Sequence, residues 1–270
     1  MIKRFFGRLN LGLTIIKNLK NWPNIFFNYF GVIHNKFLTF KFRNGSEVKL
    51  RNILNKGDTS GIATIWEIFI KKNYTPKGFE INKDDTIIDI GANIGVFSLY
   101  SALKSINGKV YSYEPFETHY QRLTDNIKLN NLINIFPFNL AVCEKSGKRN
   151  LFISNQSSGM HSVVFDKNSS GTKMVNCTTL KDIFKQNNIK QCDFLKIDCE
   201  GAEYEIIYST PKEIFKKIKK IALEFDNIDK EKKNCLELKN FLEKNNFEVR
   251  ISGAEQHQGI LYAKQKSNFL

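Results

Sequence analysis

A glycine-containing turn follows an apolar segment near residue 90. Residues 86–90 read Thr-Ile-Ile-Asp-Ile, and residues 91–95 read Gly-Ala-Asn-Ile-Gly. The apolar run predicts a buried strand, and the glycines predict a turn into a helix whose first N–H groups are free. The turn is neither a dinucleotide fingerprint nor a phosphate loop. Because Asp89 precedes it, the turn favours a cationic ligand, and S-adenosylmethionine, a sulfonium with an amino-acid tail, is one.

A second acid, Glu114, ends the next apolar segment, 25 residues after Asp89. In doubly wound folds an acid at this position accepts hydrogen bonds from ribose hydroxyls. Pro115 and Phe116 follow and are placed to pack on an adenine ring. A purely structural acid is the alternative interpretation, and the glycine turn upstream favours nucleotide recognition.

Three carboxylates, Asp198, Glu200 and Glu203, stand at the end of a third apolar segment, residues 193–198. Helix capping and pairing with the helix dipole are sufficient to explain why an acid stands at Glu200 or Glu203. Lys196 is different, because a lysine inside an apolar strand requires a carboxylate partner. The segment therefore predicts a group of charged residues at a strand end.

Alternating strands and helices must position these residues. We expect strands at 86–90, 109–113, 133–142, 193–198 and 220–225, helices at 95–106, 117–130, 179–186, 202–208 and 229–245, and an antiparallel pair at 247–251 and 259–263. This alternation predicts a mostly parallel sheet with helices on both faces. Residues 151–175 break the alternation and predict a hairpin-like insertion over the carboxyl ends of the strands, where α/β enzymes bind ligands.

The segment before the sheet is basic and aromatic. Residues 1–30 alternate basic and apolar residues, which indicates an amphipathic helix lying either on a membrane surface or on its own domain. The Asn44-Gly45 dipeptide predicts a hairpin at 36–51, and a helix follows at 62–72. We expect residues 1–76 to form a basic helix and hairpin extension, and residues 77–270 to form the main domain.

The composition limits the compartment and the partners. Lys and Arg number 41 against 27 Asp and Glu, and no acid precedes Glu47. Such a charge attracts phosphates, nucleic acid or an anionic membrane, although solvated lysines are an equal alternative. Five cysteines without a C-x-x-C pair argue against a disulfide framework or a structural zinc site. Without a signal peptide or an apolar run of about 20 residues, we expect a cytoplasmic protein, and the N-terminal basic helix leaves peripheral association with the inner membrane face open as an alternative.

Together, the three motifs resemble the FkbM-like family of S-adenosylmethionine-dependent methyltransferases. The resemblance rests on DIGANIG at 89–95, YSYEPFETHYQRLTDNIKLN at 111–130, FNLAV at 138–142, KIDCEGAE at 196–203 and Leu-Glu at 223–224. Order and spacing match over about residues 44–225. The chain departs from the family at Cys199, where an aliphatic residue is usual, and in the divergent segment 149–176.

The resemblance implies a class I methyltransferase fold and a cofactor site. The fold would be α/β, a Rossmann-like, mostly parallel seven-stranded sheet with a β-hairpin insertion and a small N-terminal α+β extension. The resemblance places S-adenosylmethionine against nine residues: Asp89, Gly91, Asn93 and Gly95 around the methionine part, Glu114 at the ribose, and Pro115, Phe116, Asn139 and Ala141 near the adenine. The implied reaction is transfer of a methyl group to a hydroxyl.

A neutral hydroxyl must lose its proton as the new bond forms, so a general base is needed. Asp198 is the first candidate, His161 in the insertion the second, and Glu200 is the further carboxylate at the same strand end. Asp198 could instead position Lys196 or the cofactor amine, and His161 could be a surface loop residue. A magnesium ion held by Asp198 with Glu224 or Asp226 is compatible with the chemistry but not expected.

Three functions are consistent with these features. The first is an O-methyltransferase acting on a sugar, glycan or related small molecule, including one carried on a phosphate-containing group. The basic charge gives the second, an RNA methyltransferase, although nucleic acid is not the expected partner. A non-catalytic, membrane-associated protein with a vestigial cofactor pocket is the third.

Overall fold

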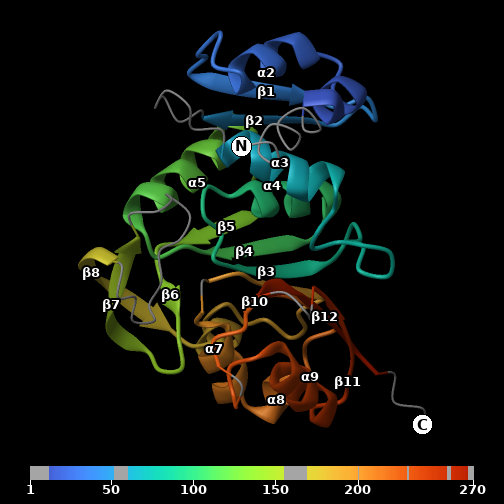
Figure 1. The fold of residues 1–270 in the computed structure, drawn as a ribbon. Coiled ribbons are helices and arrows are strands. Elements are labelled where there is room, and N and C mark those ends of the chain that lie inside the picture. The colour runs from blue at the N-terminus through green and yellow to red at the C-terminus, as the bar shows by residue number, and fades with distance from the viewer. Residues whose placement is uncertain are drawn as a thin grey trace.

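The computed structural model describes residues 12–51, 60–154, 169–199, 201–229, 231–253 and 257–266. A seven-stranded sheet in the order β11-β12-β10-β9-β3-β4-β5 forms its centre (Figure 1). The strands are β3 (Thr86–Ile90), β4 (Lys109–Tyr113), β5 (Ile135–Phe138), β9 (Phe194–Ile197), β10 (Lys220–Asp226), β11 (Phe247–Ser252) and β12 (Gln258–Gln265). Strands β10, β9, β3, β4 and β5 pair in parallel, and β12 is antiparallel to β10 and β11. The predicted mostly parallel seven-stranded α/β sheet is confirmed.

The direction of the strand order reverses at β3. The chain passes from β3 to β4 and β5 on one side and later returns to β9 on the other. In such sheets ligands bind at the carboxyl ends of the strands beside this reversal. The ends of β3, β4 and β9 are also where the sequence places its charged motifs.

Helices cover both faces of the sheet. They are α4 (Val96–Lys104), α5 (Glu117–Leu129), α6 (Leu180–Gln186), α7 (Glu203–Ser209), α8 (Lys212–Phe215) and α9 (Cys235–Lys244). Two hydrophobic clusters follow from the alternation of side chains along β3: Ile87 packs with residues of α4 and α5, and Ile88 and Ile90 pack with residues of α6 to α9. Asp89 therefore lies on the same face as Ile87, toward α4.

The N-terminal elements lie beside α4 and α5, at the top of Figure 1. Residues 12–18 are helical, and α2 (Trp22–Tyr29), β1 (Phe37–Lys41), β2 (Glu47–Arg51), α3 (Ser60–Ile65) and a π-helical turn η1 (Trp66–Ile70) follow. The predicted hairpin is confirmed, since β1 and β2 pair antiparallel. Apolar residues from these elements join the same cluster as Ile87. The domain boundary at residue 76 stays a prediction.

One strand and one helix of the main sheet region differ most from their predicted bounds. The strand expected at 133–142 ends at Phe138, because the Asn139 side chain donates to the carbonyls of Glu114 and Pro115 and turns the chain. The helix expected at 229–245 begins only at Cys235. Asp229 accepts three backbone N–H groups in the preceding loop, and Asn234 caps the helix by accepting from Leu236 and Glu237.

The insertion is a second, three-stranded sheet in the order β6-β8-β7. Its strands are β6 (Ala141–Val142), β7 (Gly147–Ser154) and β8 (Ser169–Thr178), and the antiparallel β7–β8 pair confirms the predicted hairpin. Arg149 on β7 forms an ion pair with Glu205 on α7, 2.5 Å apart. Residues 155–168 lie outside the described part of the chain, so a position over the strand ends stays a prediction. Within the described ranges, no helix combines the length and hydropathy needed to cross a bilayer.

Candidate functional site

The glycine turn after β3 brings three strand ends together. Gly91 and Gly95 have φ angles of +73° and +89°, and Asn93 between them has +51°. A Cβ atom on Gly91 would lie 1.7 Å from the carbonyl oxygen of Asp198, so only glycine allows this approach to the end of β9. The N–H groups of Gly91 and Ala92 both donate to the Tyr113 carbonyl at the end of β4, each at 3.0 Å.

Gly95 has a different neighbour. A Cβ atom there would lie 2.4 Å from Cδ1 of Leu123, so this glycine allows α4 to pack against α5. Its local role is therefore helix packing at the start of α4.

A buried lysine connects the charged groups of β3 and β9. Asp89 and Lys196 are paired in register on neighbouring strands, and Lys196 Nζ lies 3.3 Å from Asp89 Oδ1 and 3.3 Å from Asp198 Oδ2. The amine also donates to the Gly91 carbonyl at 2.8 Å. Ser98 on α4 donates to the other oxygen of Asp89 at 2.6 Å. The prediction that Lys196 has a carboxylate partner is confirmed.

The charge on Lys196 is stabilised by these partners. Burial alone lowers the pKa of this amine, but Asp198 and Asp89 outweigh the burial and raise the pKa above its ordinary value. Lys196 therefore stays protonated and holds the glycine turn by its carbonyl.

Glu114 is buried at the end of β4 and accepts two backbone hydrogen bonds. Its Oε2 accepts from the Asn93 N–H at 2.8 Å, and its Oε1 accepts from the Phe116 N–H at 2.9 Å. Burial raises the pKa of Glu114 to about 7, although the two N–H groups act to lower it. Each carboxylate oxygen has two lone pairs, so both can accept a further hydrogen bond.

A second acidic group surrounds Tyr74, at the ends of β9 and β10. Tyr74 Oη lies 2.9 Å from Asp198 Oδ2 and 2.8 Å from Glu224 Oε2, and Gln258 on β12 donates to the other Glu224 oxygen at 2.7 Å. The tyrosine hydroxyl has one hydrogen, so it can donate to only one of the two carboxylates at a time. Both contacts are hydrogen bonds when Glu224 is protonated.

The pKa values of Glu224 and Tyr74 are consistent with a protonated Glu224 that donates to the Tyr74 hydroxyl while this hydroxyl donates to Asp198. Burial and the charge of Asp198 raise the pKa of Glu224 to about 7. Burial and the same two carboxylates raise the pKa of Tyr74 well above its ordinary value, so the phenol stays neutral. Asp198 is partly open to solvent, with 31% of its side chain exposed.

The charges at this edge of the sheet fit a cationic ligand. Four carboxylates, Asp89, Glu114, Asp198 and Glu224, lie around the Lys196 amine, and the His119 ring, which is a cation only when protonated, lies 3.9 Å from Glu114. When all four are ionised, one amine leaves an excess of three negative charges. A sulfonium and an ammonium group, as in S-adenosylmethionine, would reduce this excess, and Glu114 keeps acceptor capacity for ribose hydroxyls.

The structure connects some of the predicted site residues and separates others. Asp89, Asp198 and the Gly91 carbonyl share Lys196, and Asn93 and Asn139 both donate to Glu114 at the end of the neighbouring strand. Pro115 and Phe116 are half-buried beside Glu114, whereas Ala141 is buried in β6 of the insertion sheet. His161 and Glu200 lie outside the described residues.

Sequence reasoning missed Tyr74 and Gln258. Tyr74 is 124 residues before Asp198 and belongs to no motif, so no sequence signal could have found it. Among the residues that the structure describes, no three His, Cys, Asp or Glu side chains are arranged to hold a metal ion.

Comparison with known proteins identifies the family. The model of the methyltransferase FkbM domain family matches residues 89–249. The chain is 24% identical over 193 residues to the AMB antimetabolite synthetase AmbE of Pseudomonas aeruginosa, a match over 58% of this chain and 9% of the synthetase. It is 21% identical over 192 residues to the 31-O-demethyl-FK506 methyltransferase FkbM of Streptomyces tacrolimicus, covering 60% of this chain and 74% of that protein.

Among solved structures, the chain is similar to M. jannaschii TYW2 in complex with AdoMet. That likeness has a TM-score of 0.44 at 17% identity, over 86% of this chain and 87% of TYW2. The family match spans more than half of the chain and includes the glycine turn, Glu114, Lys196 and Asp198. The chain therefore belongs to the methyltransferase FkbM domain family, and residues 89–249 are part of an S-adenosylmethionine-dependent methyltransferase domain.

Proposed function

We propose that the protein is an O-methyltransferase that methylates a hydroxyl of a sugar, a glycan or a related small molecule. The observation that carries this proposal is the adjacency of two acidic groups at one sheet edge. Glu114 lies at the side suited to a cationic nucleotide, and Lys196 connects the buried Asp89 to Asp198, which contacts the Tyr74–Glu224 pair. The Streptomyces relative, by its name, acts on an O-demethylated compound, which is consistent with a hydroxyl acceptor.

When bound, S-adenosylmethionine supplies a methyl group on a positively charged sulfur. Glu114 would accept hydrogen bonds from the ribose hydroxyls with its remaining lone pairs. The backbone at Gly91 and Asn93 would lie beside the methionine part of the cofactor, and Pro115 and Phe116 would lie beside its adenine. Asp89 does not need to touch the cofactor, because it acts through Lys196 on the Gly91 carbonyl.

Asp198 is our proposed general base. Its side chain is 31% exposed, so an acceptor hydroxyl could reach it, and the buried Tyr74 lies between it and Glu224. The acceptor proton would pass to Asp198 as the methyl group moved from sulfur to the acceptor oxygen, and the Tyr74 hydroxyl connects this carboxylate to Glu224. His161 and Glu200 remain candidates from the sequence alone.

The first test is calorimetric titration of the protein with S-adenosylmethionine, with NAD as the control ligand. We expect S-adenosylmethionine alone to bind, and Glu114→Gln to weaken binding roughly tenfold or more, since hydrogen bonds to a charged group are lost. Glu117→Gln, three residues later in the first turn of α5, removes the same charge outside the network and should bind normally. Absence of binding to the unaltered protein would contradict the proposal.

The acceptor is then sought by transfer of a labelled methyl group to sugars, glycans and their phosphate-linked carriers. Asp198→Asn should keep cofactor binding and lose transfer. Transfer to RNA, inhibited by salt, would instead favour the RNA methyltransferase alternative.

We also propose peripheral contact between the N-terminal elements and the cytoplasmic face of an anionic membrane. Five large apolar side chains are exposed there, Leu13, Phe27, Phe30, Val32 and Phe37, and the exposed Lys17, Lys20 and Lys36 lie among them in the sequence. Apolar and basic side chains together favour an anionic interface. Flotation of the protein with anionic vesicles tests this contact. The double variant Phe27→Ser with Phe30→Ser should no longer float. Equal flotation of the variant and the unaltered protein would show that these two residues do not contact the membrane.

A further inference from the structure

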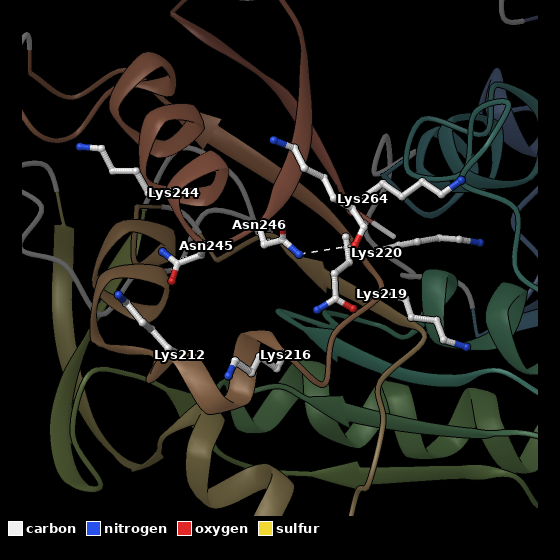
Figure 2. A pocket seen from close by; sticks show the side chains of 10 residues that line it. Lys212, Lys216, Lys219, Lys220, Lys244, Asn245, Asn246 and Lys264 are labelled. Atoms are coloured by element: carbon white, nitrogen blue, oxygen red, sulfur yellow. Dashed lines mark hydrogen bonds between the residues drawn. The ribbon is translucent and has the colours of Figure 1, made fainter. Parts of the chain in front are cut away.

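A basic groove lies at the end of the sheet opposite the candidate active site. It has a volume of about 760 Å³, and its ten lining residues are seven lysines, two asparagines and one glutamine. Figure 2 shows Lys212, Lys216 and Lys244 on one side of the open space and Lys219, Lys220 and Lys264 on the other, with the amines of Lys219, Lys220 and Lys244 directed away from its centre. The described residues contribute no carboxylate and no aromatic side chain to the lining.

The groove is separate from the site built above. Lys219 and Lys220 lie at the amino end of β10, whereas Glu224 lies toward its carboxyl end. Four residues of strand at about 3.3 Å each put roughly 13 Å between Lys220 and Glu224. A ligand in the groove therefore does not occupy the carboxyl edge where methyl transfer is proposed.

Most of the groove lysines have no neutralising partner. Lys219 pairs with Asp193 at 2.8 Å, and Lys220 donates to the Glu80 carbonyl at 2.7 Å. For the remaining five, no carboxylate oxygen of the described residues lies within 4.0 Å: Lys212, Lys216, Lys244, Lys264 and Lys266. Like charges held together without counter-charges cost stability, which a bound anion would offset.

The strand register adds to this repulsion. Lys220 on β10 lies directly opposite Lys264 on β12, and like charges opposite each other destabilise an antiparallel pair. Glu248 on β11 is the next cross-strand neighbour of Lys264, but it does not line the groove and forms no ion pair with the lysine. The fold therefore keeps an unfavourable pair of lysines at the wall of a concave site.

We propose that this groove binds the phosphate chain of a di- or triphosphate compound. Lysine amines are compact point charges that suit several phosphate oxygens at once. Because none of the described lining residues is aromatic, they offer no surface for stacking bases, which favours a phosphate chain over single-stranded RNA. Its concave shape and polar lining suit a discrete ligand better than the plane of a membrane. A soluble polyphosphate and the diphosphate headgroup of a lipid share this chemistry.

The test is calorimetric titration of the full chain with tripolyphosphate, pyrophosphate and orthophosphate at low salt. We expect tripolyphosphate to bind most tightly, because it contacts more lysines, and binding to weaken as salt is added. The double variant Lys216→Gln with Lys264→Gln should lower the affinity at least tenfold. Lys145→Gln with Lys148→Gln makes the same charge change at exposed residues outside the groove and should bind as the unaltered protein does.

The remaining measurements separate the ligand sources and the alternatives. Flotation with phosphatidylcholine vesicles that contain a polyprenyl diphosphate, lost in the groove variant, assigns a lipid source; tripolyphosphate binding without flotation assigns a soluble one. Three results would each overturn the proposal. Tripolyphosphate and pyrophosphate could fail to bind, or both double variants could lose the same affinity. The third is RNA binding that only the groove variant loses. Titration with S-adenosylmethionine should be unchanged in both variants, which separates this test from that of the proposed function.

Discussion

Lys196 is the residue on which the charged network depends. Its amine is buried and contacts Asp89, Asp198 and the Gly91 carbonyl, so removal of the charge would leave two carboxylates without their cation. A buried ion pair adds little net stability over an apolar pair, but breaking one by removing a single partner is costly. The lysine is therefore needed for the position of the glycine turn and for the stability of the sheet around it.

We expect Lys196→Met to lower the free energy of unfolding by about 3–5 kcal/mol, because Asp89 becomes an unpaired buried charge. Urea unfolding measures the loss, and Lys190→Met, at an exposed position, serves as the control. The double variant Lys196→Met with Asp89→Asn should recover part of the loss. If the double variant is no more stable than Lys196→Met, the Asp89–Lys196 pair does not explain the effect.

Glu224 makes stability depend on pH in a definite direction. Its pKa in the folded chain is about 7, raised first by burial from an ordinary value of 4.5. The stabilisation by a protonated Glu224 is complete below its unfolded pKa and is lost as the pH rises through about 7. We expect the unfolding free energy of Glu224→Gln to fall less than that of the unaltered protein between about pH 5 and pH 8. Glu213→Gln, exposed on α8, should keep the full pH dependence, and an identical fall in all three proteins would contradict the assignment.

Gly91 in the glycine turn determines how closely the end of β3 approaches the end of β9. Gly91 and Gly78 both have positive φ angles, +73° and +88°, but a Cβ atom on Gly78 would meet no atom within 4 Å. Gly78→Ala should therefore cost only the backbone strain, about 1–2 kcal/mol. Gly91→Ala adds a collision with the Asp198 carbonyl and should also abolish S-adenosylmethionine binding. Chemical denaturation and calorimetry of the two variants measure both effects; equal losses would mean that strain alone matters.

The elements that sequence analysis located best are those fixed by local pattern. Strands β3 and β4 have the predicted bounds, since an apolar run followed by glycine or proline marks their ends. The end of β5 was missed because it depends on the Asn139 side chain bonding to Glu114, 25 residues earlier. Tyr74 and Gln258 reach the site only through the packing of distant segments, which spacing within a motif does not encode.

Across the whole molecule, the charges divide between the two ends of the sheet. Carboxylates gather at the carboxyl ends of β3, β4, β9 and β10, and lysines gather at the amino end of β10. Two of those carboxyl groups, Glu114 and Glu224, have pKa values near 7 because they are buried. The acidic end is therefore partly protonated in the absence of a cation.

We expect binding of S-adenosylmethionine at neutral pH to release protons, because a positive ligand favours the ionised forms of Glu114 and Glu224. Calorimetry in two buffers with different ionisation enthalpies measures the number released. Glu114→Gln with Glu224→Gln should reduce proton release at ligand concentrations that saturate the variant. Binding heats that do not depend on the buffer would show that the protonation states do not change.

The contact between β2 and α5 has a consequence for self-association. The Lys49 N–H donates to the Asn130 side chain, which donates back to the Lys49 carbonyl, and the Arg51 N–H donates to the Asn126 side chain. These amides occupy backbone groups that an open strand edge would offer to another chain. Two asparagines on a helix thus take the place of a third strand, and they protect the hairpin from growing into an intermolecular β-sheet.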